Sequence, residues 1–159
     1  MGMTSRAKLI YGVDLGDEND GVELPWNAEF IEDDIDAWWR SIKGYKPPFE
    51  MFDAAGSWLP GMESQKDKQR EYYNHRYAWE AENPCPVELE WLGHPDYAAK
   101  VLTVKGSNTF ESEWSEATEI NLLVLSETSR MEATLQAFCA EYGITPLKGP
   151  CWILGAYYG

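Results

Sequence analysis

The densest chemical feature of this sequence is a run of ten carboxylates from Asp14 to Asp36 that contains no lysine or arginine. Carboxylates gathered in this number can ligate cations or attract a basic partner. The whole chain has 27 acidic and 13 basic side chains and a formal net charge of −14. Because so acidic a surface repels nucleic-acid backbones and anionic lipid head groups, the composition favours a basic protein as partner over nucleic acid or membrane.

The second half of this run falls on a predicted helix that begins near Asn27, a favourable N-cap residue, and ends at Gly44. One face of this helix is apolar, with Ile31, Ile35, Trp38 and Ile42. The opposite face carries Glu29, Glu32, Asp33 and Asp36. Acids early in a helix and bases late also suit its dipole, so an ordinary solvated face is the alternative interpretation.

We expect the acidic side chains to contact a basic protein partner. The contacts would come from the helical carboxylates, from the turn upstream and from two tryptophans in predicted loops, which would serve as aromatic anchors. The candidate partner-binding residues are Asp17, Glu18, Asp20, Trp26, Glu29, Glu32, Asp33, Asp36 and Trp58. In its strictest form the hypothesis is a DNA mimic, which inhibits a nucleic-acid-binding protein by occupying its cationic groove.

The turn at residues 17–21 (DENDG) partly matches an EF-hand calcium loop. A complete loop would need an acid at position 16 and a glutamate at position 27, where the chain has Gly16 and Asn27. A turn closed by Asx-type hydrogen bonds is therefore expected. The two histidines and three cysteines are scattered and have no zinc-ligand spacing. We expect no metal site and no cofactor.

The segment YGVDLG (residues 11–16) resembles the first phosphate motif of actin-like ATPases and the first catalytic strand of ribonuclease-H-like nucleases. The second resemblance implies a metal-dependent nuclease in which Asp14 holds the metal. The chain is too short for a two-lobed ATPase, and residues 17–23 are polar where a ribonuclease-H-like fold continues into a second apolar strand. Asp14 is expected to end a strand and begin the turn, with the nuclease as an alternative function.

Other reactive side chains lack the neighbours that catalysis requires. A catalytic histidine needs a nucleophile and an orienting group, and the sequence around His75 and His94 supplies neither. Cys139 lies on an apolar helix face and Cys151 opens an apolar strand, so we expect both to be buried. On a helix at residues 62–81, four bases are balanced by acids, which predicts a salt-bridged helix whose tyrosines and tryptophan pack on the sheet. No enzymatic activity is predicted.

The elements that position these groups follow from hydrophobic periodicity. Residues 8–15 and 151–158 are apolar on both faces, which predicts two strands in a sheet interior. Residues 87–91 alternate apolar and acidic and, with residues 99–105, predict an antiparallel hairpin. Residues 45–61 are rich in proline and aromatic side chains, which indicates an ordered loop packed on the body.

The C-terminal third predicts an acidic loop at 107–118, a short strand at 120–125 and a helix that ends at Gly143. A capping box formed by Ser129 and Glu132 would start this helix. Its buried face would consist of Met131, Leu135, Phe138, Cys139 and Tyr142.

This order of elements predicts an α+β fold, a single domain over residues 7–159 in which three helices pack on a mainly antiparallel sheet of four to five strands. Residues 1–2 are interpreted as an expression scar before Met3. Three cysteines without a signal peptide, and no apolar run of membrane length, predict a cytoplasmic location.

Three segments resemble a loose group of small acidic proteins of unknown function, encoded by bacteriophages and by actinobacteria with phage-derived genes. They are LIYGVDL (residues 9–15), YAAKVLTVK (97–105) and PCWILGAYYG (150–159). This group has no established activity that could be transferred to the chain. The resemblance implies a phage accessory factor that acts by binding in the host cytoplasm. The sequence thus predicts a non-enzymatic binding protein, a monomer or small homo-oligomer, that engages a basic partner through its acidic surface.

Overall fold

The computed structural model describes residues 5–17, 21–26, 35–53, 56–93, 98–107, 110–113 and 127–158. The chain divides into two compact units. The sheet unit comprises residues 1–35 and 86–159, and the helical unit comprises residues 36–85. The prediction of one domain over residues 7–159 stays a prediction, and each unit is described by itself.

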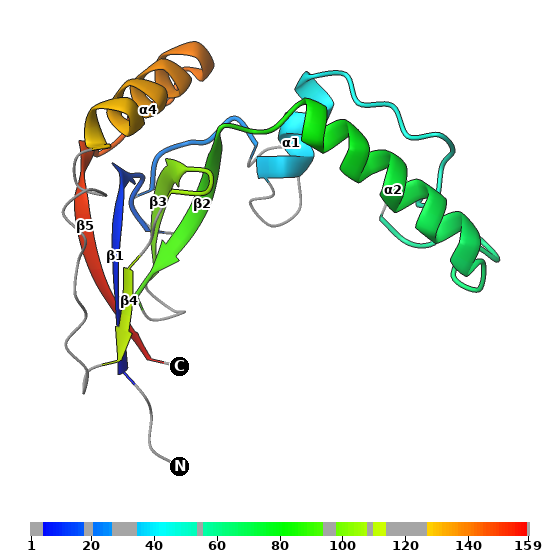
Figure 1. The fold of residues 1–159 in the computed structure, drawn as a ribbon, viewed down its shortest axis with the longest axis horizontal. Coiled ribbons are helices and arrows are strands. Elements are labelled where there is room, and N and C mark those ends of the chain that lie inside the picture. Colours follow the sequence, from blue (N-terminus) through cyan, green and yellow to red (C-terminus); the bar gives the residue numbers. More distant parts are fainter. Residues whose placement is uncertain are drawn as a thin grey trace. The chain divides into compact units, whose positions relative to one another are not determined.

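The described residues form three helices and a five-stranded antiparallel sheet, so the predicted α+β class is confirmed (Figure 1). Strand β1 (Ser5–Asp14) is the centre of this sheet. It pairs with β5 (Lys148–Tyr158) from Ser5 opposite Tyr158 to Asp14 opposite Lys148, with a shift of register between Gly12 and Asp14. Ile10, Tyr11 and Val13 of β1 are all buried, as expected for a strand covered on both faces.

The other edge of β1 is shared by two strands that lie end to end. Strand β3 (Ala99–Val104) pairs with Gly12–Asp14, and β4 (Phe110–Glu113) pairs with Arg6–Leu9. Strand β3 ends at Val104, and the N–H of Ser107 donates to the carbonyl of Val104 at 2.9 Å in the turn that follows it. The prediction of a loop at 107–118 is therefore wrong for residues 110–113, whose backbone completes the hydrogen bonding of β1. The strand predicted at 120–125 lies outside the described residues.

The predicted hairpin is confirmed, with β2 (Val87–Leu92) antiparallel to β3. Thr103 in β3 is fully buried, and its hydroxyl hydrogen-bonds to the carbonyl oxygen of Tyr11 at 2.8 Å. Trp91, expected on the buried face of the hairpin, is 42% exposed and lies under the ammonium group of Lys100.

Strand β5 was expected in the sheet interior, but among the described strands it pairs only with β1, so it is an outer strand. Cys151 and Leu154 on β5 are exposed, which corrects the expectation that both faces of this strand are buried. The sheet also coils, because Gly155 of β5 lies against Leu92 of β2, although β3 and β1 separate these two strands in the sheet.

Helix α4 (Thr128–Tyr142) packs against β1, β3 and β5. Its predicted buried face is confirmed for Met131, Leu135, Phe138 and Cys139, whereas Tyr142 is only half-buried. The helix ends at Gly143, whose φ of +70° favours glycine. The capping box is wrong, because the N-cap residue is Glu127 and Ser129 already lies inside the first turn.

The helical unit contains α2 (Lys66–Glu82) and all of α1 (Ile35–Ile42) except its first residue. Trp38 and Trp39 of α1 are buried, whereas Ile42, expected on the apolar stripe, is 44% exposed. The helix ends at Gly44, which has a φ of +75°. The expected start near Asn27 lies outside the described residues.

The loop at 45–61 is ordered where described, since Met51 is buried and Phe52 forms a β-bridge with Trp58. Its rings contact those of α2, with Phe49 on Tyr72 and Tyr45 on Trp79. These contacts lie within the helical unit, whereas packing of the α2 rings on the sheet had been expected. No described helix is both long enough and apolar enough to cross a membrane.

Candidate protein-binding cleft

The predicted partner-binding residues do not form one described surface. Glu18, Asp20, Glu29, Glu32 and Asp33 lie outside the described residues. Asp17 belongs to the sheet unit and Asp36 to the helical unit, and both side chains are half-buried.

The two proposed aromatic anchors differ in exposure. Trp26 is 0% exposed, so the assignment of an exposed anchor is wrong for this residue, whose indole instead fills the protein interior. Trp58 is 38% exposed and packs on Phe52 at a centroid distance of 4.7 Å.

Asp14 begins the turn that follows β1, as the sequence predicts. One of its carboxylate oxygens, Oδ1, accepts a hydrogen bond of 2.9 Å from the backbone N–H of Gly16, which is an Asx-type contact. The turn closes where the N–H of Val22 donates to the carbonyl of Leu15 at 2.8 Å. Gly21 is required here, because a Cβ would lie 2.3 Å from the carbonyl oxygen of Asp17. This turn sets the direction of the segment that follows it.

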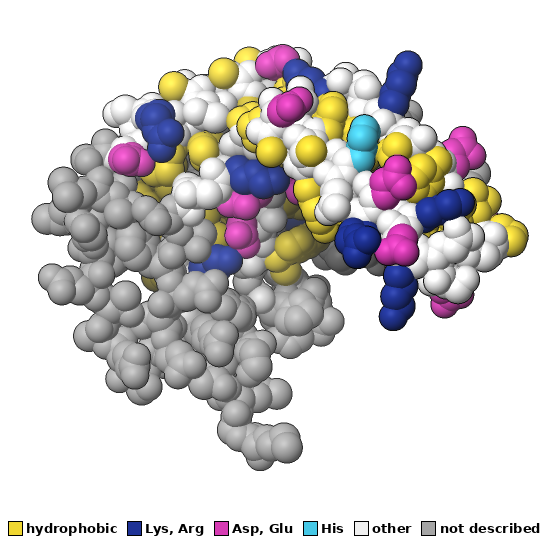
Figure 2. Space-filling view, turned by 45° about the vertical axis from the view of Figure 1, so that its right-hand side comes forward, with side chains coloured by type: hydrophobic (Ala, Val, Ile, Leu, Met, Phe, Trp, Pro, Cys, Tyr) yellow, Lys and Arg dark blue, Asp and Glu magenta, His cyan; other side chains and the backbone are white. Residues whose placement is uncertain are grey.

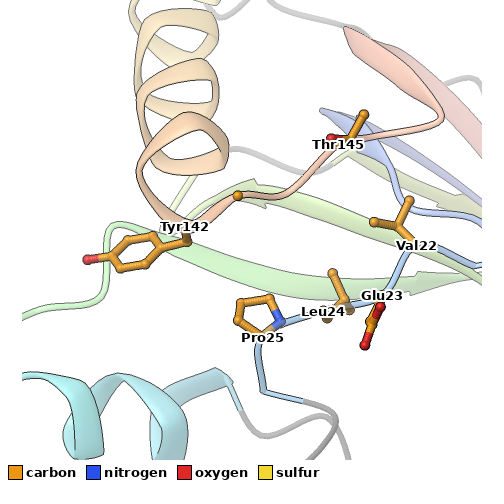
Figure 3. Close-up of a pocket in the computed structure, with 7 residues that line it drawn as sticks. Val22, Glu23, Leu24, Pro25, Tyr142 and Thr145 are labelled. Atoms are coloured by element: carbon orange, nitrogen blue, oxygen red, sulfur yellow. The ribbon is translucent and has the colours of Figure 1, made fainter.

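That segment forms one wall of a cleft of about 460 Å³ in the sheet unit. The other wall is the chain that leaves α4 at its C-terminal end. We call this site the α4-end cleft, and it is lined by Val22, Glu23, Leu24, Pro25, Tyr142, Gly143 and Thr145. Figure 3 shows the pyrrolidine ring of Pro25 between Leu24 and the phenol of Tyr142, and the carboxylate of Glu23 directed away from Tyr142.

Backbone hydrogen bonds fix the wall that follows α4. The N–H of Ile144 donates to the carbonyl of Cys139 at 2.9 Å, and Ile144 is buried. The N–H of Leu147 donates to the carbonyl of Asp14 at 2.9 Å, which ties this wall to the end of β1. Both walls of the cleft are therefore anchored at the same end of the central strand.

The electrostatic character of the cleft is negative. The C-terminal end of a helix carries the negative end of its dipole, and the last turn of α4 contains Glu141 but no base. Glu23 and Glu141 are both exposed. An apolar wall beside an uncompensated negative end suits a long basic side chain, whose methylene stem packs on apolar surface while its charged head meets carboxylates.

The two units differ strongly in charge. The helical unit has seven of the thirteen bases and eight of the 27 acids, which leaves six bases against nineteen acids in the sheet unit. Within the helical unit, Arg40 and Arg76 both donate to Glu80 Oε1 at 2.8 Å, and Arg70 donates to Asp67 at 2.9 Å. These three bases are therefore engaged with carboxylates of α2, and the negative charge of the chain is concentrated in the sheet unit.

Two buried groups of the sheet unit have shifted pKa values. Burial raises the pKa of Cys139, which lines a smaller apolar cavity of about 280 Å³ with Val13 and Leu135. Burial also raises the pKa of Tyr11, with a further contribution from the negative charge of Glu132. Within the part of the chain that the structure describes, no three His, Cys, Asp or Glu residues are grouped to hold a metal ion.

Sequence reasoning missed the residues of the α4-end cleft. It placed Val22, Leu24 and Pro25 inside an acidic run and took no account of their apolar side chains. The signals were present, since these residues follow the turn directly and Gly143 marks the end of the facing helix. Comparison of the chain with protein-family models, with curated proteins and with solved structures finds no match.

Proposed function

We propose that this protein is a non-enzymatic binding protein that engages a basic segment of a protein partner through its sheet unit. The α4-end cleft receives a lysine or arginine side chain of that segment, and the surrounding carboxylates attract the remaining basic groups. The resemblance to small acidic phage proteins adds a cytoplasmic accessory role to this proposal.

One observation carries the proposal, the position of a cleft lined by both apolar and polar groups at the base-free carboxyl end of α4, within the unit that holds nineteen of the 27 acids. Charge alone would favour a diffuse attraction for any polycation. A cleft with fixed walls adds a place where one side chain is desolvated, and a desolvated contact of this kind is what gives an interface its specificity. The DNA mimic is a narrower form of the same proposal.

The test uses a fluorescently labelled octa-arginine peptide and measures its binding by anisotropy at low and at physiological ionic strength. The Glu23→Lys/Glu141→Lys double variant reverses the two exposed carboxylates of the cleft region. The control, Glu71→Lys/Glu82→Lys, makes the same change of net charge on exposed positions of α2. We expect at least tenfold weaker binding for the cleft variant and less than threefold for the control.

A second variant distinguishes binding in the cleft from the general electrostatic attraction of the acidic surface. Thr145→Trp fills the cleft from an exposed position without changing any charge, and we expect it to weaken peptide binding by a similar factor. Equal losses of peptide affinity in the two charge variants, together with unchanged binding by Thr145→Trp, would show that the peptide is held only by non-specific charge attraction. That outcome would reject the cleft as the binding site. A pulldown from lysate at two salt concentrations then identifies the natural partner.

A further inference from the structure

A second cavity of the sheet unit lies between α4 and the chain that follows it, and its volume is about 280 Å³. Its floor consists of buried side chains from β1, from α4 and from the segment after α4, which are Val13, Leu135, Cys139 and Ile144. Gln136, Ala140 and Gly149 also line it, and these three residues are exposed. The cavity therefore has a buried floor and a mouth that is open to solvent. We call it the α4 cavity.

The α4 cavity is separate from the α4-end cleft, although one short segment of chain borders both. Gly143 and Thr145 line the cleft, whereas Ile144 and Pro146 line the cavity. Alternate residues of this segment thus belong to different sites, so a ligand in the cavity leaves the cleft unoccupied.

The walls of the α4 cavity are fixed by the backbone. The N–H of Leu147 donates to the carbonyl of Asp14 at 2.9 Å, which ties the segment after α4 to the end of β1. Pro146 and Pro150 line the cavity, and the ring of each proline restricts its backbone. Walls held in this way resist collapse into the empty space, so the cavity is formed before any ligand binds.

The chemistry of the lining favours an uncharged ligand. Of the described residues that line the cavity, none carries a charge. Burial raises the pKa of Cys139, so its thiol is protonated and neutral at pH 7. The amide of Gln136 already donates from Nε2 to Glu132 at 3.0 Å. A charged group would lose its hydration in this cavity and would meet no opposite charge in the described lining.

The outer surface has a different character. Figure 2 shows hydrophobic side chains interspersed with Lys, Arg, Asp and Glu side chains over the described residues of that face. Scattered hydrophobic side chains of this kind are normal on a soluble protein and indicate no site. The α4 cavity instead gathers mainly apolar side chains around a concave space, which is the form that small-molecule sites take.

We propose that the α4 cavity binds a small uncharged aromatic molecule of one or two rings. An apolar cavity of about 150 Å³ holds benzene, so the larger volume of this cavity accommodates a second fused ring. A rigid ring also loses less conformational freedom on binding than a flexible chain. The soft sulfur of Cys139 is a favourable neighbour for such a ring. This site adds small-molecule binding to the proposed protein binding and does not depend on it.

Binding of indole to the full chain, measured by isothermal titration calorimetry, tests the proposal. We expect a dissociation constant on the order of 0.1–1 mM, as suits so small a ligand. Ala140→Phe and Gly149→Leu each place a larger side chain at the exposed mouth, and a Cβ at Gly149 meets nothing within 4 Å. Each variant should weaken indole binding at least fivefold.

The matched control is Ala137→Phe, which makes the same change at an exposed position of α4 outside the cavity lining. It should leave the affinity for indole unchanged. Circular dichroism and melting temperatures show whether each variant is folded. Because both filling positions are exposed, we expect all three variants to fold.

The thiol of Cys139 gives a readout in the cavity itself. In a Cys151→Ser background, which removes the exposed thiol, peptide mass spectrometry follows the reaction of the two buried cysteines with methyl methanethiosulfonate. Saturating indole should slow the modification of Cys139 at least threefold and leave that of Cys85, in the helical unit, unchanged. The proposal is overturned by an absence of indole binding at millimolar concentration, by binding that both filling variants leave intact, or by equal protection of the two cysteines.

Discussion

The ammonium group of Lys8 in β1 lies 2.9 Å from the carboxylate of Glu90 in β2, and the two side chains are only 13% and 26% exposed. These residues are 82 positions apart in the sequence. Their strands are not neighbours, because β3 lies between β2 and β1 in the sheet. The ion pair therefore bridges the coiled face of the sheet on the side where Leu92, Ile10 and Val101 form a buried cluster.

Replacement of Lys8 by Met should lower the free energy of unfolding of the sheet unit by about 1–2 kcal/mol, because it leaves a half-buried carboxylate without this partner. Urea denaturation followed by fluorescence measures the loss. Arg130→Met is the matched control, since the Arg130–Glu127 pair is 74% and 60% exposed and should contribute less than about 0.5 kcal/mol. Equal losses for the two variants would contradict the bridging role.

Gly155→Ala should destabilise the protein by about 1–3 kcal/mol, because the added methyl group would lie 2.8 Å from the Cβ of Leu92. Gly149→Ala in the same strand meets nothing within 4 Å and should change stability by less than about 0.5 kcal/mol. Urea midpoints of the two variants give the comparison. A neutral Gly155→Ala would mean that β5 and β2 do not touch.

Thr103→Val should cost about 1–2 kcal/mol, because the hydroxyl is fully buried and its loss leaves the carbonyl of Tyr11 without this donor. The single hydroxyl proton of Thr103 is used on that carbonyl, so the contact at 2.9 Å with Ser107 is donated by the Ser107 hydroxyl. Ser107→Ala should cost less than Thr103→Val in the same denaturation experiment. The reverse order would show that the carbonyl of Tyr11 finds another donor.

Stability should fall as the pH rises above about 9. Burial raises the pKa of Cys139 above its ordinary value of 9.0 and that of Tyr11 above 10.0. The unfolded chain therefore loses these protons first, so it binds fewer protons than the folded chain and is favoured as the pH increases. Melting temperatures between pH 7 and pH 11 measure the trend, and Cys139→Ala should flatten its first part. A melting temperature that stays constant to pH 11 would contradict the burial of both groups.

Much of the fold follows from local patterns. The stripe Met131, Leu135, Phe138 and Cys139 predicts α4 and its buried face, because a helix packed on one side must repeat its apolar residues every three to four positions. The alternation at 87–91 and the turn after it predict the hairpin for the same kind of reason.

The errors came where tertiary pairing overrides local pattern. Strand β4 has the sequence FESE, which no periodicity distinguishes from loop, and it is a strand because β1 offers an unfilled edge there. Trp26 is predicted to be an aromatic anchor because it lies in a predicted loop and not on a helical apolar stripe, whereas the structure buries its ring completely. The division into two units, and with it the separation of charge, follows from long-range contacts that a single sequence does not display.

The pairing of β1 with β5 has a consequence for biosynthesis. A ribosome makes Ser5–Asp14 early, yet the strand that covers that whole edge is translated only after α4. Until then the nascent chain carries an apolar strand with an open side, which is the kind of surface that chaperones bind and that promotes aggregation. The same pairing holds Ser5 beside Tyr158, so a short peptide joining these positions should yield a circular permutant that can be opened between the exposed residues Lys105 and Gly106.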